Sequence, residues 1–131
     1  MSASLTQGPV DKTHQHILQQ LQIYLDALYD GDADALRSTL HPAAQIFAEV
    51  RGVIIQKSLD VYLQGVASRK SPASLNEAYG MSVLSVEVIG KIASAKVRVR
   101  MGDFRYQNFL SLLKVGCEWL IVNKLYTHID D

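Results

Sequence analysis

The chain has 131 residues, 48% of them apolar, and its 13 basic side chains balance its 13 acidic ones. This length is typical of one domain, and the apolar fraction is enough to build a core without cross-links. A pI near 6.9 excludes the strongly basic surface of most nucleic-acid-binding domains. The single cysteine, Cys117, fits a reducing compartment. Since neither a signal-peptide pattern nor an apolar run of about 20 residues occurs, we predict a cytoplasmic protein that does not bind membranes.

The N-terminal quarter of the sequence has the apolar spacing of a long helix. Residues 1–10 are polar and predict a disordered tail. From 11 to 29, apolar side chains recur every three or four positions, which places them on one face of a helix. Asp11 or Thr13 is suited to cap the start of this helix, and Gly31 is suited to end it in a left-handed conformation.

Two shorter helices are predicted further along the chain. Asp32 is a good N-cap for a helix at 33–40, which Pro42 would end. Ser58 precedes a third helical pattern at 59–67, whose apolar stripe faces one side. All three predicted helices therefore have an apolar face to bury against another layer.

The remaining apolar segments are typical of strands. Strong alternation at 92–100 predicts a strand with one buried face, and a drift in phase within 83–86 predicts a bulge. The last two runs are joined through Gly116 and Cys117 and predict a long hairpin. The predicted strands are 44–50, 53–56, 76–89, 92–100, 106–115 and 119–126.

The order of these elements, α-α-β-β-α-β-β-β-β, predicts an α+β fold. Four long strands form a twisted sheet with one apolar face, and the three helices cover that face. A curved sheet covered in this way forms a cone with a mouth, which is a natural site for a small molecule. We therefore predict a single domain over residues 11–131, with a pocket between the helices and the sheet.

Four stretches of the sequence carry a family resemblance. They are Y-L-D-A-L-Y-D-G-D-A-D-A-L at 24–36, H-P-A-A-Q-I at 41–46, S-V-E-V-I-G-K-I-A-S-A-K-V at 85–97, and F-L-S-L-L-K-V with W-L-I-V-N-K at 109–124. Together they resemble the NTF2-like superfamily (nuclear transport factor 2, SnoaL, ketosteroid isomerase), and within it the branch described as putative lumazine-binding. The resemblance implies a cone-shaped fold, a homodimer and a lumazine-type ligand. It implies no single activity, because the superfamily contains isomerases, dehydratases, cyclases and transport factors.

Acid–base catalysis in such a pocket needs a base in partly apolar surroundings and a donor opposite it. Tyr24, on the apolar helix face, is the candidate oxyanion donor, and His41 and Glu49 are the candidate bases. Tyr24 is alternatively a core residue, and His41 a helix-terminal residue that bonds the last carbonyl groups. The pair of acids that the isomerase resemblance implies is missing, so an isomerase, dehydratase or cyclase is the alternative function rather than the first.

The sequence motifs of metal and nucleotide sites are absent. His14 and His16 are two positions apart, so that they face different directions on a helix. No H-E-x-x-H, C-x-x-C, G-x-G-x-x-G or Walker sequence occurs. We therefore predict no metal and no cofactor.

Binding of a flat heterocycle requires aromatic rings and a few amide groups. If Trp119 faces inward, alternation places Ile121, Asn123 and Leu125 on the same side. Asn123 would then be a polar group in the pocket or a structural tie to a neighbouring backbone. The candidate ligand-binding residues are Phe47, Tyr62, Tyr79, Tyr106, Asn108, Trp119 and Asn123.

A third class of function is interaction alone. Lys96, Arg98, Arg100 and Arg105 would lie on the outer face of the sheet, where they either face solvent or contact a second copy of the chain. The leading hypothesis is a homodimeric small-molecule-binding protein. The alternatives are a cofactor-independent acid–base enzyme and a dimeric scaffold with no pocket activity.

Overall fold

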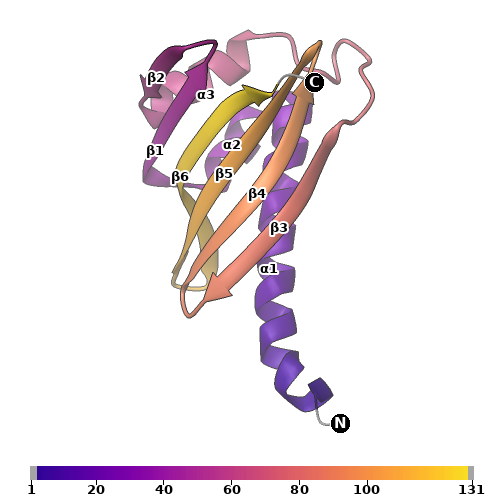
Figure 1. Cartoon of the computed structure of the whole chain (residues 1–131), viewed down its shortest axis with the longest axis vertical. Coiled ribbons are helices and arrows are strands. Elements are labelled where there is room, and N and C mark those ends of the chain that lie inside the picture. The colour runs from indigo at the N-terminus through magenta and orange to yellow at the C-terminus, as the bar shows by residue number, and fades with distance from the viewer. Residues whose placement is uncertain (1–2, 130–131) are drawn as a thin grey trace.

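In the computed structural model, which describes residues 3–129, three helices pack against one face of a six-stranded curved sheet (Figure 1). The fold is α+β, and the elements follow the order that the sequence predicts. The helices are α1 (Ala3–Asp30), α2 (Ala33–Ser38) and α3 (Leu59–Ser68). The strands are β1 (Leu40–Val50), β2 (Val53–Lys57), β3 (Met81–Ile89), β4 (Ile92–Met101), β5 (Phe104–Val115) and β6 (Glu118–Ile129).

The sheet has the strand order β2-β1-β6-β5-β4-β3. All neighbours are antiparallel except β1 and β6, which are parallel and pair Phe47 with Leu125. This parallel pair joins the β1–β2 hairpin to the four long strands. The sheet therefore has six strands, and the predicted sheet of four strands is too small. The sequence could not show this pairing, because about 70 residues of intervening chain separate the two strands and alternation within a strand does not name its partner.

Two bulges change which residues face the helices. In β3 the register shifts between Val83 and Ser85, which confirms the bulge predicted within 83–86. In β6, Asn123 pairs with Ser111 while Ile121 pairs with Leu112, so Val122 is the extra residue. Because a bulge reverses the alternation beyond it, the predicted inward face of Asn123 and Leu125 is wrong. Leu125 is 43% exposed, whereas its neighbour in sequence, Lys124, is buried.

The helix ends confirm the predicted end of α1 at Gly31 and the predicted N-cap of α2 at Asp32, and they correct two other predictions. Gly31 has a φ of 70°, and the N–H of Asp32 bonds the Ala27 carbonyl at 2.9 Å, so α1 ends as predicted. Its start at Ala3, however, lies within the segment for which we predict a disordered tail, and not at the predicted caps. Helix α2 ends at Ser38 instead of at Pro42, because Leu40 already belongs to β1.

The core lies between α1 and the concave face of the sheet. One face of α1 is buried, as its apolar spacing predicts, and α3 covers the end of the sheet near β1 (Figure 1). The alternating side chains of β4 and β5 form the opposite wall. The buried residues of α1, β4 and β5 are Ile17, Leu21, Tyr24, Leu25, Ala27, Leu28, Ala93, Ala95, Val97, Val99, Asn108, Leu110 and Leu112.

Replacing Gly31 tests the junction between α1 and α2. A Cβ at Gly31 would lie 2.9 Å from the Ser71 Cβ, and the positive φ adds backbone strain. We expect Gly31→Ala to lower the free energy of unfolding by about 1–3 kcal/mol in urea denaturation. Gly116→Ala is the matched control, since Gly116 has a φ of 62° but open space around it. Equal losses in the two variants would contradict a role for the Ser71 contact.

Candidate functional site

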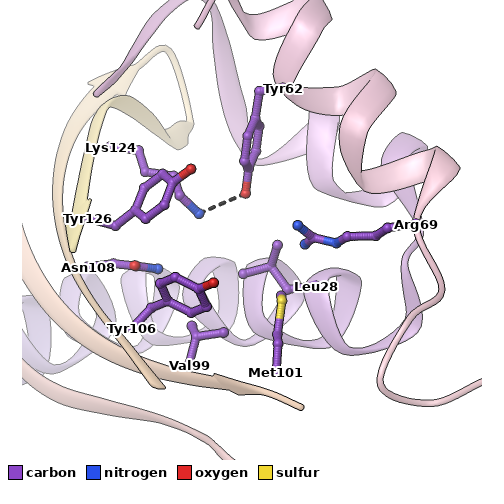
Figure 2. A pocket seen from close by; sticks show the side chains of 9 residues that line it. All are labelled: Leu28, Tyr62, Arg69, Val99, Met101, Tyr106, Asn108, Lys124 and Tyr126. Atoms are coloured by element: carbon purple, nitrogen blue, oxygen red, sulfur yellow. Dashed lines mark hydrogen bonds between the residues drawn. The ribbon is translucent and has the colours of Figure 1, made fainter. Parts of the chain in front are cut away.

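A cavity of about 80 Å³ opens between the concave face of the sheet and the helices (Figure 2). Its walls come from α1, α3 and the strands β4, β5 and β6, together with Arg69 just after α3. The lining residues are Leu28, Tyr62, Arg69, Val99, Met101, Tyr106, Asn108, Lys124 and Tyr126.

Lys124 is the residue around which the cavity is organised. Its side chain is buried, with 4% of the residue exposed, and Figure 2 shows its amine directed toward Tyr62. The amine nitrogen Nζ lies 2.5 Å from the Tyr24 hydroxyl oxygen and 2.7 Å from that of Tyr62. None of the carboxylates in the described part of the chain bonds this amine. A lysine buried without a carboxylate partner is rare, because its charged form loses its hydration with no compensating ion pair.

Burial determines the protonation of this amine. It lowers the pKa of Lys124 well below the ordinary value, and the positive charges of Arg69 and Lys57 lower it further. Three tyrosine rings have their centroids 4.7–5.1 Å from Nζ, an arrangement that favours the charged form. Burial and the two neighbouring cations act in the opposite direction and shift the amine toward its unprotonated form, which has a lone pair.

The tyrosine hydroxyls stay neutral. Burial raises the pKa of Tyr24 and of Tyr62, so neither hydroxyl readily becomes a phenolate that would neutralise a charged lysine. The Tyr24 oxygen also accepts a hydrogen bond from the side-chain amide of Asn108 at 3.1 Å. A neutral amine can donate to one hydroxyl and accept from another, so the Lys124–Tyr24–Tyr62–Asn108 cluster is satisfied without any net charge. In the described residues no buried side-chain nitrogen or oxygen lacks a hydrogen-bond partner.

Arg69 lies at the rim of this cavity. It is the C-cap of α3 and is exposed, and its guanidinium points toward the interior in Figure 2. A guanidinium at an open rim binds carboxylates and other planar oxygen anions through paired N–H groups. The amine and the guanidinium thus present donors to the same cavity from two sides.

Four of the residues singled out from the sequence meet here. Tyr62, Tyr106 and Asn108 line the cavity, and the Tyr24 hydroxyl accepts a hydrogen bond from the Lys124 amine. The rings of Tyr106 and Tyr126 meet edge to face with centroids 5.9 Å apart. Whether these residues act on a ligand stays a prediction.

The other aromatic candidates and Asn123 lie elsewhere. Trp119 is buried near the start of β6, where its carbonyl accepts a bond from Gln20 at 2.8 Å. Tyr79 precedes β3 and is 45% exposed, and its hydroxyl donates to Asp26 at 2.9 Å. Phe47 alternates with buried Ile46 and Ala48 and so faces outward on β1, and Asn123 is turned to the outer face by the bulge at Val122. None of these four residues lines the Lys124 cavity.

The two candidate bases are also outside the cavity. His41 lies in β1 and its Nδ1 accepts a bond from the Ala43 N–H at 2.9 Å, so its predicted position at a helix end is wrong. Glu49 accepts bonds from Thr127 at 2.8 Å and from the Gly52 N–H at 2.7 Å. These bonds lower the pKa of Glu49, the Thr127 bond most, which makes this exposed carboxylate a weaker base. It borders a separate hollow of about 280 Å³ with Phe109 and Leu125.

Sequence reasoning missed Lys124, Arg69 and Tyr126. A lysine inside the apolar run W-L-I-V-N-K-L-Y was a signal, but simple alternation from Trp119 turned it toward solvent. The bulge at Val122 reverses that direction and also brings Tyr126 inward. Among the described residues no group of three His, Cys, Asp or Glu side chains is arranged to hold a metal, and no helix is long and apolar enough to cross a membrane.

The pH dependence of stability tests the state of Lys124. Its folded pKa lies below its unfolded pKa of about 10.4, so the unfolded chain binds more protons between the two values and stability rises with pH. We therefore compare the free energy of unfolding of the wild type with that of Lys124→Met between the two pKa values and below about pH 9.5. The difference should rise with pH by up to about 1.4 kcal/mol per pH unit. The charged or titratable groups around the amine are Tyr24, Tyr62, Tyr126, Arg69 and Lys57.

Urea unfolding at several pH values measures this slope. Keeping the pH below about 9.5 avoids titration of the tyrosines, whose ordinary pKa is about 10. Lys114→Met is the control, because Lys114 is exposed on β5 and its removal should leave the slope unchanged. Parallel stability curves for the wild type and Lys124→Met would contradict the depressed pKa.

Comparison with known proteins agrees with this architecture. The family model described as "Putative lumazine-binding" matches residues 12–127. An NTF2-like protein of unknown function from Silicibacter pomeroyi DSS-3 is 22% identical, with a TM-score of 0.79 over 92% of this chain and 98% of that one. One from Shewanella baltica OS155 is 20% identical, with a TM-score of 0.80 over 92% and 96%.

A third solved structure, an NTF2-like protein of unknown function from Methylobacillus flagellatus KT, is 22% identical, with a TM-score of 0.74 over 91% of this chain and 94% of that one. At these identities the likeness establishes the fold alone. No curated protein matches the chain. Since the family model covers most of the sequence, the chain belongs to the family described as putative lumazine-binding, and its fold is that of the NTF2-like proteins.

Proposed function

We propose that this protein binds a small molecule with a carbonyl or carboxylate oxygen in the Lys124 cavity. The observation that carries the proposal is a buried lysine amine that faces an open cavity and has two tyrosine partners but no carboxylate partner within residues 3–129. An arrangement of this kind weakens the fold, because a lysine costs free energy to bury and an apolar residue of similar size would not. A ligand oxygen that accepts a hydrogen bond from the amine would explain why a lysine is buried at this position.

The size of the cavity limits how a ligand enters. Its volume of about 80 Å³ is smaller than the roughly 150 Å³ apolar cavity that holds benzene. The ligand is therefore short, or it inserts only one end. A flat heterocycle such as a lumazine-type compound would insert an edge that carries an oxo group, with the rings of Tyr62, Tyr106 and Tyr126 beside it. The family description supports this ligand class.

The same cluster supports acid–base catalysis as a second candidate function. An unprotonated amine is a general base, and the Tyr24 hydroxyl 2.5 Å from it is a proton donor for a developing oxyanion. This version of the enzyme hypothesis keeps Tyr24 but replaces His41 and Glu49 by Lys124 as the base. A scaffold without pocket activity is the third candidate and would show neither binding nor turnover.

We also propose that the outer face of the sheet forms a homodimer. The register places Phe47, Leu125 and Phe109 side by side across three strands, with Lys96 next in the row. Phe109 is 48% exposed and Leu125 43% exposed. An exposed apolar row of this kind, flanked by the basic side chains of β4, is typical of a surface that pairs with its own copy.

Ligand-dependent stability tests the binding proposal. We expect thermal unfolding in the presence of short carboxylates, α-keto acids and lumazine-type heterocycles to reveal at least one ligand that stabilises the wild type. The gain should be about 2.7 kcal/mol at a ligand concentration of 100 times Kd, and it should be lost in Lys124→Met and reduced in Arg69→Gln.

The controls separate the three candidate functions. Lys114→Met should respond like the wild type, because Lys114 is exposed and distant from the cavity in the sheet register. An enzyme would lose turnover in Tyr24→Phe while the substrate still stabilised the fold. If no compound stabilises the protein and no turnover is seen, the binding proposal is contradicted and the scaffold hypothesis remains.

Oligomeric state tests the sheet-face dimer. A buried carboxylate in the apolar row is unfavourable, so Phe109→Glu should shift a wild-type dimer to monomer in native mass spectrometry. Val115→Glu is the matched control, because Val115 is 42% exposed at the far end of the same strand. A monomeric wild type, or a Phe109→Glu dimer as stable as the control, would contradict this interface.

A further inference from the structure

Lys124 has a chemical property that non-covalent binding does not use, since its nitrogen is a nucleophile held inside a cavity. A lysine amine becomes nucleophilic when it loses its proton, and desolvation or a neighbouring cation favours that loss. Both conditions hold here. Lys124 is 4% exposed, and the Arg69 guanidinium shares the cavity with it.

We propose that Lys124 forms an imine with an aldehyde or ketone that also carries a carboxylate, of which a short α-keto acid is the smallest example. This inference rests on the proposed small-molecule site and deepens it by naming the reactive group of the ligand. The carboxylate is required because Arg69 lies at the rim and points inward across from the amine (Figure 2). A short ligand is required because the cavity holds only about 80 Å³.

The residues beside the amine supply the proton transfers that imine formation needs. The Nζ lone pair attacks the carbonyl carbon, so that a C–N bond forms and the carbonyl oxygen takes a proton from a neighbouring hydroxyl. Nζ returns a proton to that hydroxyl, which leaves a neutral carbinolamine. The carbinolamine hydroxyl then leaves as water, taking the remaining proton from Nζ, and the C=N bond forms. The hydroxyls of Tyr24 and Tyr62 lie 2.5 and 2.7 Å from Nζ and can carry these protons.

The net reaction is balanced without a further reactant, since one amine and one carbonyl compound give one imine and one water. The side-chain amide of Asn108 also donates to the Tyr24 hydroxyl at 3.1 Å, which helps to hold that hydroxyl near the amine. Lys114 on β5 illustrates the contrast, because it is exposed and does not line the Lys124 cavity.

Reductive trapping tests the inference. The full-length protein is incubated with pyruvate, and in parallel with glyoxylate, in the presence of sodium cyanoborohydride near neutral pH, and it is then analysed by intact mass and peptide mapping. We expect one adduct per chain whose mass equals that of the acid minus one oxygen atom, located at Lys124. Labelling there should exceed that at any other lysine by at least about tenfold, because each unit of pKa depression raises the unprotonated fraction about tenfold.

The controls distinguish failure of the imine from failure of the site. Lys124→Met should lose the adduct, Lys114→Met should keep it, and Arg69→Gln should reduce it while preserving the fold. Mapping in the wild type does not depend on how well any variant folds. Labelling spread evenly over exposed lysines, or no label at Lys124 with either acid, would overturn the imine. If the acids still stabilise the unlabelled protein, the binding proposal stands; if no compound of the panel does, both fail.

Discussion

The bonding of one buried amine to two tyrosine hydroxyls joins all the layers of this fold. Tyr24 comes from α1, Tyr62 from α3, Asn108 from β5 and Lys124 from β6. The cluster therefore connects α1 and α3 to the sheet. Removing one partner would leave buried polar groups unsatisfied, at a cost of about 1–3 kcal/mol each. The cluster therefore positions the helices over the sheet and keeps the amine at the cavity.

The bulge at Val122 is what places the amine there. Without the extra residue, Lys124 would point to the outer face, the same face as the basic side chains of β4, and Leu125 would face the core. Bulges recur near functional sites because they redirect a side chain without disturbing the rest of the sheet. In this chain the bulge exchanges an apolar core residue for a lysine, a change that reduces stability and supplies a reactive group.

Sequence patterns were sufficient for the elements and most of their faces. Apolar spacing predicted the buried side of α1, including Tyr24, and the alternation of β4 predicted its inward side chains, because both depend on local periodicity. The order of the elements predicted the cone and its pocket, and the family resemblance implied the same cone. Lys124 could not be placed, because the continuous apolar run 120–122 hides the change in alternation at this bulge, whereas a visible drift in phase predicted the bulge in β3. Arg69 was missed because it lies after a helix, where no periodicity applies.

The central claim is that Lys124 is held toward its unprotonated form inside an accessible cavity. The most direct measurement is an NMR titration of the lysine side chains, with the Lys124 signal assigned by its absence in Lys124→Met. The structure predicts that this signal titrates well below the ordinary lysine pKa of about 10.4. A Lys124 signal that titrates with the exposed lysines would contradict the claim, and with it the basis for the proposed site.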